Sequence, residues 1–290
     1  KGGSVTEVQP GRFLMLRGRN LLVGRITVTR SGYGFVDGGP GASVYINAKY
    51  MAGAMNGDTV AVRVHERSHR KGGISGEVAY VVDRANETIV GRLERHGKVG
   101  FVIPHDRRIR GDVFISPASL GEANHGDMVV AKLTVYPTGT NAAQGAIIEV
   151  IGPEGDPGVD IEVIIREHGL RTGYPEAAIA EAAVIEVDIE AEVATGREDL
   201  RALYTVTIDP VDARDFDDAV SIERKTDGGW RLWVHIADVG WFVPWDGPVD
   251  QEARERSTSV YLVDRVLPML PERLSNELCS LRPDEERLAF

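Results

Sequence analysis

Cysteine is nearly absent from this chain, since Cys279 is the only one in 290 residues. A single cysteine excludes an internal disulfide framework and any zinc cage built from cysteines, and we expect Cys279 to be a small core residue rather than a nucleophile. Long apolar runs are also absent, because no stretch approaches the roughly 18 residues of a membrane span. The first residues, Lys1 to Ser4, contain no signal-peptide core. These absences predict a cytoplasmic protein with no membrane partner.

Basic residues are scarce only in the second part of the chain. Residues 1–152 hold 19 Lys and Arg against 13 Asp and Glu. The remaining residues hold 14 Lys and Arg against 31 Asp and Glu, and the net charge of the whole chain is −11. A basic half suits a polyanion and an acidic half suits metal ions, although two differently solvated surfaces would give the same division. The length is enough for about two or three globular domains.

The basic part contains one sequence pattern twice. The matching segments are 23–26 with 90–93, 32–36 with 98–102, 43–46 with 112–115, and 56–61 with 125–130. Each copy alternates short segments rich in Val, Ile, Tyr and Phe with Gly, Asn or Asp, and shows helical patterns only at 48–55 and 117–123. Closely spaced strands of this kind predict a small antiparallel barrel. We therefore expect two barrels in tandem.

The repeated segments resemble cold-shock barrels of the OB type, whose facing strands carry Gly-Phe-Gly-Phe-like and Val-Phe-Ile-like stretches. Alternation along a strand puts Tyr33 and Phe35 on one face, where aromatic rings can stack on unpaired bases for roughly 1–3 kcal/mol each. The candidate base-stacking residues are Tyr33, Phe35, Tyr45, Phe101 and Phe114. The candidate phosphate contacts are Arg25, Arg92 and Lys98, and also Arg30, Arg95, Arg107, Arg108 and Arg110. The alternative is that the phenylalanines form barrel core and the arginines are merely solvated.

Five aspartates crowd into ten residues of the acidic half, and they are Asp209, Asp212, Asp215, Asp217 and Asp218. Apolar residues flank the run, so we expect the carboxylates to lie where the chain leaves a buried strand, with little water to relieve their repulsion. Magnesium prefers oxygen ligands and usually keeps several waters, and four carboxylates can hold two ions about 3.5–4 Å apart. The run predicts a site for one or two Mg²⁺ ions, with Mn²⁺ as the alternative.

A calcium loop of the EF-hand type is excluded by two positions. Val220 is sixth, where a Gly is needed, and Thr226 is twelfth, where a Glu is needed. A solvated turn capped by aspartates is the remaining structural alternative, but capping uses one or two aspartates rather than five. Arg214 is either a phosphate contact or a salt-bridge partner of the aspartates.

Several regular elements are expected in the acidic half. The turn 155–158 marks the end of the second barrel. We expect strands at 159–165, 207–209, 219–223 and 231–237, with a hairpin turn at 226–229. We expect helices at 175–185, 250–257 and 272–279.

A family resemblance extends over nearly the whole chain from about Leu21. The segment 207–219 is similar to Thr-Ile-Asp-Pro-x-x-Ala-x-Asp-x-Asp-Asp-Ala, which opens the catalytic RNB domain of the RNase II and RNase R exoribonucleases. The segments 234–239 and 258–281 resemble later parts of the same domain in the same order. The two cold-shock barrels ahead of them agree with the same family.

The resemblance implies hydrolysis of single-stranded RNA from its 3′ end, with release of nucleoside 5′-monophosphates and Mg²⁺ held by aspartates. The family's acidic positions correspond to Asp209, Asp215, Asp217 and Asp218, whereas Asp212 falls at a variable position. Tyr261 matches the family's aromatic residue that stacks near the 3′-terminal nucleotide, and a core tyrosine is the alternative.

Two features depart from the family. Arg256-Ser257-Thr258-Ser259 stands where the family usually reads Arg-Gly-Thr-Ser, which puts the tight backbone expected at the glycine in question. The chain also resembles only the first part of the RNB domain. We therefore expect the remainder of that domain, with a catalytic arginine and glutamate, and an S1 barrel to follow Phe290. His235 is left out of the site, because a metal-bound hydroxide needs no imidazole partner.

The expected fold is mixed and β-rich. Its parts are an N-terminal extension or linker at 1–20, cold-shock barrels at 21–85 and 86–154, and the first part of an α/β RNB domain at 155–290. The expected function is a Mg²⁺-dependent 3′ to 5′ exoribonuclease whose barrels feed in single-stranded RNA. The alternatives are an RNA-binding module or regulator with an incomplete or inactive RNB domain, and barrels that bind DNA as well as RNA.

Overall fold

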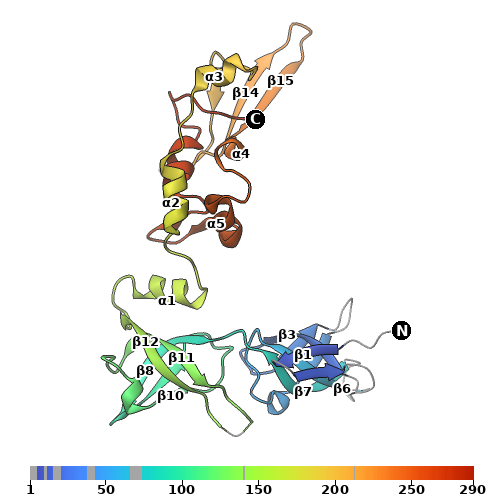
Figure 1. Cartoon of the computed structure of the whole chain (residues 1–290), viewed down its shortest axis with the longest axis vertical. Helices are drawn as coiled ribbons and strands as arrows, with labels where there is room; N and C mark the ends of the chain where they lie inside the picture. Colours follow the sequence, from blue (N-terminus) through green and yellow to red (C-terminus); the bar gives the residue numbers. More distant parts are fainter. Residues whose placement is uncertain are drawn as a thin grey trace. The chain divides into compact units, whose positions relative to one another are not determined.

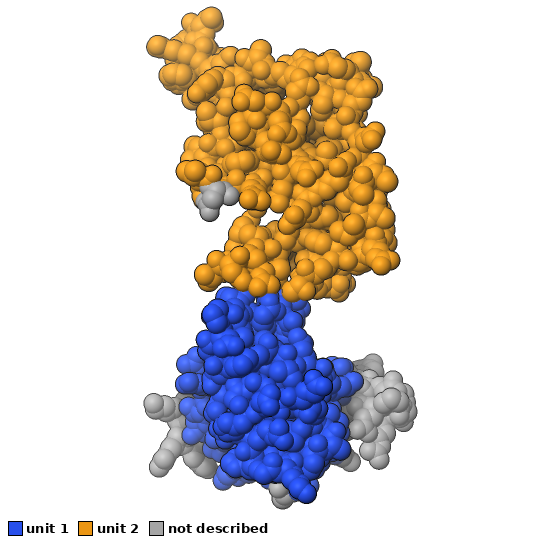
Figure 2. All heavy atoms as spheres, turned by 90° about the vertical axis from the view of Figure 1, so that its left-hand side faces the viewer, with its two compact units in different colours: residues 1–170 blue, residues 171–290 orange. Residues whose placement is uncertain are grey.

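The computed structural model describes residues 5–9, 12–15, 21–37, 43–65, 74–139, 141–211 and 213–290 (Figure 1). Asp212 therefore lies outside the described residues. Contacts divide the chain into two compact units, residues 1–170 and 171–290, which have different colours in Figure 2. Among the described residues, no helix is both long enough and apolar enough to cross a membrane.

The first unit contains two closed five-stranded barrels of the same topology. The first barrel is built from β3 (Leu21–Val28), β4 (Gly34–Asp37), β5 (Ser43–Ile46), β6 (Thr59–His65) and β7 (Ile74–Asp83). The second is built from β8 (Thr88–His96), β9 (Val99–Pro104), β10 (Val113–Ile115), β11 (Asp127–Val135) and β12 (Gln144–Pro153). In both, the third strand pairs in parallel with the fifth, and the other ladders are antiparallel. The two OB-type barrels expected from the sequence repeat are confirmed.

Strand alternation separates core from surface in each barrel. Along β4, Val36 is fully buried whereas Phe35 points outward. The first core is formed mainly by Ile26, Val36, Ile46, Val60 and Val62, and the second mainly by Leu93, Val102, Ile115, Val129 and Leu133. The 3₁₀ turns η1 (Ala48–Tyr50) and η2 (Pro117–Ser119) occupy only the start of each helical pattern expected from the sequence.

Two further elements belong to the first unit. The N-terminal part, expected to be an extension or linker, contains a hairpin of β1 (Val5–Gln9) and β2 (Arg12–Met15). The expected strand at 159–165 is wrong, because α1 (Val159–Glu167) forms there. Its apolar residues at every second position imitate a strand, but Asp160 and Glu162 favour a helix N-terminus. Val159 and Val163 pack against the second barrel, so contacts divide the chain after Leu170 rather than at 155.

The second unit combines short helices with a small sheet. Its helices are α2 (Glu176–Ala183), α3 (Ile189–Ala194), α4 (Val239–Phe242), α5 (Pro248–Arg256) and the π-helix η3 (Arg273–Leu278). Its strands are β13 (Thr205–Val206), β14 (Asp218–Arg224) and β15 (Trp230–Ile236) in one sheet, and β16 (Val260–Tyr261) with β17 (Val266–Leu267) in a two-stranded ribbon. Cys279 is buried in the core of this unit with Phe242 and Leu274, which confirms its expected packing role.

The expected strand at 207–209 is wrong, since the ladder ends at Val206 and the chain continues without regular structure. Ile208 is 89% exposed, so the aspartate run does not leave a buried strand as we expected. Ile222, Leu232 and Val234 on one face of the sheet are exposed as well. Alternation in the sequence identified β14 and β15 correctly, but it could not show whether the apolar face of the sheet is covered.

Candidate functional site: an acidic loop and two aromatic faces

The acidic residues lie on an irregular loop that leads from β13 into β14. Pro210 has a fixed φ and no amide hydrogen, which disfavours continuation of the strand ladder, and the Ala213 amide donates to its carbonyl over 3.0 Å in a turn. Asp218 is the first residue of β14, where pairing with Ile236 fixes its backbone. The loop therefore delivers its last carboxylates at the beginning of an ordered strand.

A segment far along the chain holds this loop in place. Ser280 is 1% exposed, and its hydroxyl donates to the Arg214 carbonyl over 2.7 Å while it accepts from the Phe216 amide over 3.1 Å. The Leu281 amide donates to the Phe216 carbonyl over 2.9 Å. Directly after β15, the Ala237 amide donates to the Asp217 carbonyl over 3.0 Å. Backbone groups on both sides of Asp215 are thus fixed by tertiary hydrogen bonds.

The four predicted aspartates share one electrostatic environment. The pKa of Asp217 is raised above its ordinary value, first by desolvation of its carboxyl group and then by the negative charges of Asp215, Asp218 and Asp209. Repulsion among carboxylates raises a pKa in this way only when the groups are near one another. The loop therefore gathers four carboxylates whose charges disfavour one another and favour a cation.

Oxygen donors of this kind fit magnesium in their chemistry. Within the described ranges, however, no group of three or more His, Cys, Asp and Glu side chains is arranged to hold a metal ion. The residues that would hold one are Asp209, Asp215, Asp217 and Asp218, because their charges act on one carboxyl group.

Tyr261 reaches this loop from β16. Its hydroxyl donates to Asp215 Oδ2 over 2.5 Å, and this bond, together with desolvation, raises the pKa of Tyr261 to about 12. The residue is nevertheless 64% exposed. The core alternative weighed for Tyr261 is therefore wrong, and its ring remains open to a ligand while its hydroxyl is attached to the acidic loop.

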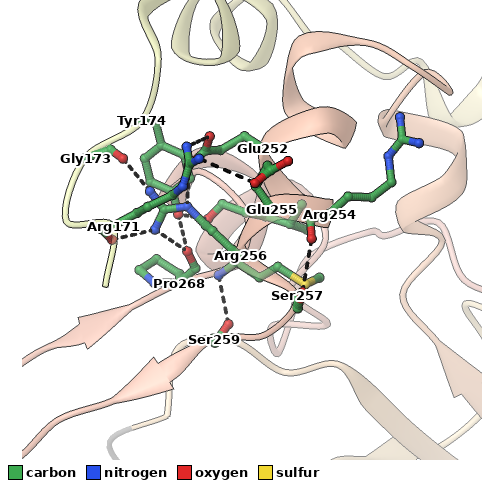
Figure 3. Close-up of polar contacts among 12 residues, drawn as sticks. Arg171, Gly173, Tyr174, Glu252, Arg254, Glu255, Arg256, Ser257, Ser259 and Pro268 are labelled. Carbon is green, nitrogen blue, oxygen red and sulfur yellow. Dashed lines mark hydrogen bonds and ion pairs between the residues drawn. The ribbon is translucent and has the colours of Figure 1, made fainter. Parts of the chain in front are cut away.

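A buried arginine fixes the segment that leads to Tyr261 (Figure 3). Arg256 pairs with Glu252 over 2.9 Å, lies 3.9 Å above the centre of the Tyr174 ring, and donates to the carbonyls of Arg171, Gly173 and Pro268. Both charged side chains are nearly inaccessible, at 5% and 4% exposure. The pairing compensates charges that would be costly to bury alone. Sequence reasoning missed this cluster, since its partners lie up to 85 positions apart.

Ser257 follows Arg256 at the point where the family usually has glycine. Its φ of 64° lies in the left-handed region, where the Cβ of any residue other than glycine is disfavoured. The Ser257 hydroxyl donates to the Arg254 carbonyl over 3.0 Å (Figure 3). Two residues later, the Ser259 hydroxyl accepts a hydrogen bond from the Met269 amide over 2.9 Å. The backbone turn expected at the glycine is thus kept, but with a serine in it.

The two barrels present matching aromatic pairs on their outer faces. Phe35 of β4 lies opposite Tyr45 of β5 with ring centres 5.7 Å apart, and Tyr33 lies 5.5 Å from Tyr45. In the second barrel, Phe101 of β9 lies opposite Phe114 of β10, also 5.7 Å apart. Both pairs lie outside the cores, so the core alternative is wrong for these phenylalanines. Tyr33 and Phe35 are 39% and 40% exposed.

The predicted basic contacts differ in their availability. Arg25 donates to the Gly57 carbonyl over 3.2 Å, and Arg92 pairs with Glu94 over 2.8 Å. Lys98 has no hydrogen-bond or ion-pair partner among the described residues. Sequence reasoning also missed His96, whose ring packs 5.8 Å from that of Phe101. The outer face of the second barrel therefore includes an imidazole that no motif indicated.

Comparison with known proteins covers both barrels and the acidic loop. Residues 24–81 match the Ribonuclease B OB domain, residues 101–175 match a cold shock domain, and residues 197–290 match the RNB domain. Ribonuclease R of Escherichia coli is 41% identical over 272 residues, which are 93% of this chain and 33% of that protein. Ribonuclease R of Acidithiobacillus ferrooxidans is 37% identical over 100% of this chain and 66% of its own length. The chain belongs to the RNase II and RNase R family.

The solved structures agree with this membership. RNase R of Mycoplasma genitalium in complex with ribose-methylated single-stranded RNA matches with a TM-score of 0.84 and 25% identity. The match covers 92% of this chain and 43% of the Mycoplasma genitalium chain. The described fold is thus that of RNase R from the first barrel into the RNB domain. The chain spans about a third of the length of the Escherichia coli relative.

Proposed function

We propose that this chain contains the metal-binding part of a 3′ to 5′ exoribonuclease that hydrolyses single-stranded RNA to nucleoside 5′-monophosphates. The observation that carries the proposal is the position of Asp209, Asp215, Asp217 and Asp218 on one loop, where burial, and then the negative charges of the other three, raise the pKa of Asp217. Membership of the family supplies the reaction class. The cytoplasmic location expected from the sequence stays a prediction.

Each residue of the loop has a role that follows from its contacts. The four carboxylates would hold Mg²⁺, which when bound supplies charge neutralisation and an activated water at the scissile phosphate. Tyr261 orients Asp215 through its hydroxyl and offers its exposed ring to the base at the 3′ end. A ring stacks on any base, so the site would hold the end of a strand without reading its sequence.

The barrels would bind the rest of the strand. The aromatic pairs on the outer faces of β4 and β5, and of β9 and β10, suit unpaired bases, and Lys98 suits a phosphate. The Mycoplasma genitalium relative, solved with single-stranded RNA, supports this assignment. A preference for RNA over DNA would need recognition of the 2′-hydroxyl. Equal affinity for RNA and DNA strands of matched sequence would favour the alternative in which the barrels bind either nucleic acid.

Replacing Asp218 by Asn in the full-length protein tests the proposed reaction. Asp218 begins β14, so its backbone is fixed and the change removes one charge with little change in volume. We expect loss of Mg²⁺-dependent nucleotide release with RNA affinity retained. Asp227→Asn is the matched control, because Asp227 lies in the exposed β14–β15 turn and caps the Gly229 amide over 2.9 Å. Unchanged release by Asp218→Asn would contradict the site assignment.

The same experiment addresses the alternative of an RNA-binding module with an inactive RNB domain. Such a protein would bind RNA but release no nucleotide, with or without the Asp218 substitution. Release by the unsubstituted full-length protein, lost in Asp218→Asn and kept in Asp227→Asn, would exclude that alternative.

A further inference from the structure

The two barrels of the first unit meet closely at one pair of loops. Gly32, in the β3–β4 turn, has a φ of +84°, and a Cβ built on it would lie 2.1 Å from Nη1 of Arg110 in the β9–β10 loop. The backbone of one barrel is therefore in contact with a guanidinium group of the other. A side chain at position 32 would displace the Arg110 guanidinium group and would also strain the backbone.

Other contacts fix the same two barrels to each other. Met55 of the first barrel belongs to the buried core cluster of the second. Arg84 donates to the Gly53 carbonyl over 2.9 Å and lies 4.4 Å above the centre of the Tyr136 ring. The junction is therefore a packed interface, and loops from both barrels can form one binding surface there.

A hollow of about 410 Å³ lies at this junction. Its lining residues are Arg30 from the first barrel, with His105, Asp106, Arg107, Arg108 and Glu167 from the second barrel and α1. The volume is within the roughly 300–1,000 Å³ of typical ligand sites.

The charges in the hollow are only partly compensated. Arg108 bonds to Asp106 over 2.9 Å, and His105 bonds to Glu167 over 3.0 Å. Both carboxylates thus have partners already, whereas Arg30 and Arg107 have no hydrogen-bond or ion-pair partner among the described residues. Guanidinium groups stay charged at all physiological pH values. The hollow is therefore left with positive charge that an anion could neutralise.

An aromatic residue follows Arg30 by three positions in the chain. Tyr33 directly follows Gly32, is 39% exposed and packs against Tyr45. Phosphates and bases alternate along a single strand, so positive groups beside an exposed ring fit a strand better than an isolated anion. The planar fork of arginine also matches phosphate oxygens in pairs.

We propose that this junction hollow binds the phosphodiester backbone of a single RNA strand through Arg30 and Arg107, while Tyr33 stacks on an adjacent base. The inference rests on the proposed function, because it takes RNA as the ligand of the barrels. It goes beyond that function by placing part of the strand across the junction rather than on one barrel alone. Arg25 and Arg92 hydrogen-bond within their own barrel, so the two junction arginines are the better phosphate contacts.

Binding of a fluorescent single-stranded oligoribonucleotide to the 290-residue chain, measured by anisotropy at several salt concentrations, tests the proposal. The variant Arg30→Ala/Arg107→Ala removes two phosphate contacts, and each contributes about 0.7 to the slope of log affinity against log salt for a single strand. We expect the slope to fall by about 1.4, and the low-salt affinity to fall roughly tenfold or more. Arg30→Lys/Arg107→Lys keeps the charges and should retain most of the slope.

The matched control is Arg63→Ala/Lys225→Ala, which removes the same charge from exposed residues that pair with Glu77 and Asp227. A slope equal in the junction variant and this control would overturn the proposal. Inorganic phosphate distinguishes the two sources of the anion. If the hollow binds free phosphate but no strand, the slope for RNA binding is the same in the unsubstituted chain and in the junction variant, while millimolar phosphate raises the thermal stability of the unsubstituted chain only; the assignment to a strand is then wrong. A lower slope in the junction variant supports the assignment.

Failure of this inference can be told apart from failure of the proposed function. Normal RNA binding by the chain with no effect of the junction variant contradicts only the hollow. An unsubstituted chain that binds no RNA contradicts the role of the barrels as well. Nucleotide release by the full-length protein, and its loss in Asp218→Asn, test the reaction independently of both.

Discussion

The hydroxyl of Tyr261 donates a hydrogen bond to a carboxylate oxygen of Asp215, 46 positions earlier in the chain. The bond keeps the phenol protonated, since the pKa of Tyr261 is raised to about 12. The same residue therefore orients one carboxylate of the acidic loop and offers an exposed ring beside it. Its two roles can be separated, because phenylalanine keeps the ring and loses the hydroxyl.

Tyr261→Ala should weaken binding of a short oligoribonucleotide with a free 3′ end. Loss of one base stack costs about 1–3 kcal/mol, which corresponds to roughly 5–150-fold in affinity. Tyr261→Phe should bind within about twofold of the unsubstituted chain, because the ring is retained. Fluorescence anisotropy measures both. Equal weakening in the two variants would show that the hydroxyl, rather than stacking, determines RNA affinity.

Ser280→Ala should weaken metal binding although Ser280 touches no predicted ligand atom. The change leaves the Phe216 amide and the Arg214 carbonyl without their shared partner, so the backbone on both sides of Asp215 is held by fewer hydrogen bonds. Outer residues that orient metal ligands typically change metal affinity by about 10–100-fold. Titration of the 290-residue chain with Mn²⁺, followed by electron paramagnetic resonance, measures the effect without catalysis.

The control for Ser280 is Ser221→Ala. Ser221 is 2% exposed and hydrogen-bonds to Thr205 and His235 within the sheet, so its loss should reduce stability to a similar extent. If both variants weaken Mn²⁺ binding equally, Ser280 acts only through general stability. Ser280→Thr keeps the hydroxyl and should recover part of the affinity.

Ser257→Gly should stabilise the protein. A residue other than glycine in the left-handed region costs about 1–2 kcal/mol, and glycine loses roughly 0.5–1 kcal/mol more on ordering the backbone. The free energy of unfolding should therefore rise by about 0.5–1 kcal/mol, measured by urea denaturation. Thr195→Gly is the comparison, because Thr195 also ends a helix and bonds to the carbonyl three residues earlier, but with φ at −82°. That variant should be destabilised, and stabilisation of both would exclude backbone strain as the cause.

Cys279 should be unreactive in the folded protein. Burial, followed by the charges of Asp217 and Asp238, raises the pKa of its thiol to about 12, so almost no thiolate exists at pH 8. We expect alkylation by iodoacetamide only after addition of denaturant. Rapid alkylation of the native chain would place the thiol in contact with solvent.

The raised pKa of Cys279 also makes the stability of the folded protein depend on pH. The folded state keeps the proton that the unfolded thiol loses near its ordinary pKa of about 8.5. The neutral thiol therefore contributes fully to the stability of the folded state below that pH. This contribution is lost as the pH rises toward about 12. Cys279→Ala should lose stability less steeply than the unsubstituted chain between these pH values, as measured by urea denaturation.

The repeated segments predict the two barrels from sequence alone, because strand alternation and turn glycines are local properties of the chain. The same alternation misled at 159–165, where apolar residues at every second position belong to α1. A local pattern does not show what an element packs against. In the structure, α1 is a helix that packs against the second barrel. The five-aspartate run likewise indicated a cation site, but not that Ile208 beside it is exposed.

By itself, the sequence determined the two OB-type barrels, the cluster of carboxylates and the aromatic residues that accompany them. Only the tertiary structure decided which groups meet. Ser280 bonds to Arg214 across 66 positions, Arg256 bonds to Arg171 across 85, and the Gly32 backbone lies against Arg110. Periodicity and turn chemistry act over a few neighbouring residues. Contacts between distant residues depend instead on how the elements between them pack, which no short stretch of sequence contains.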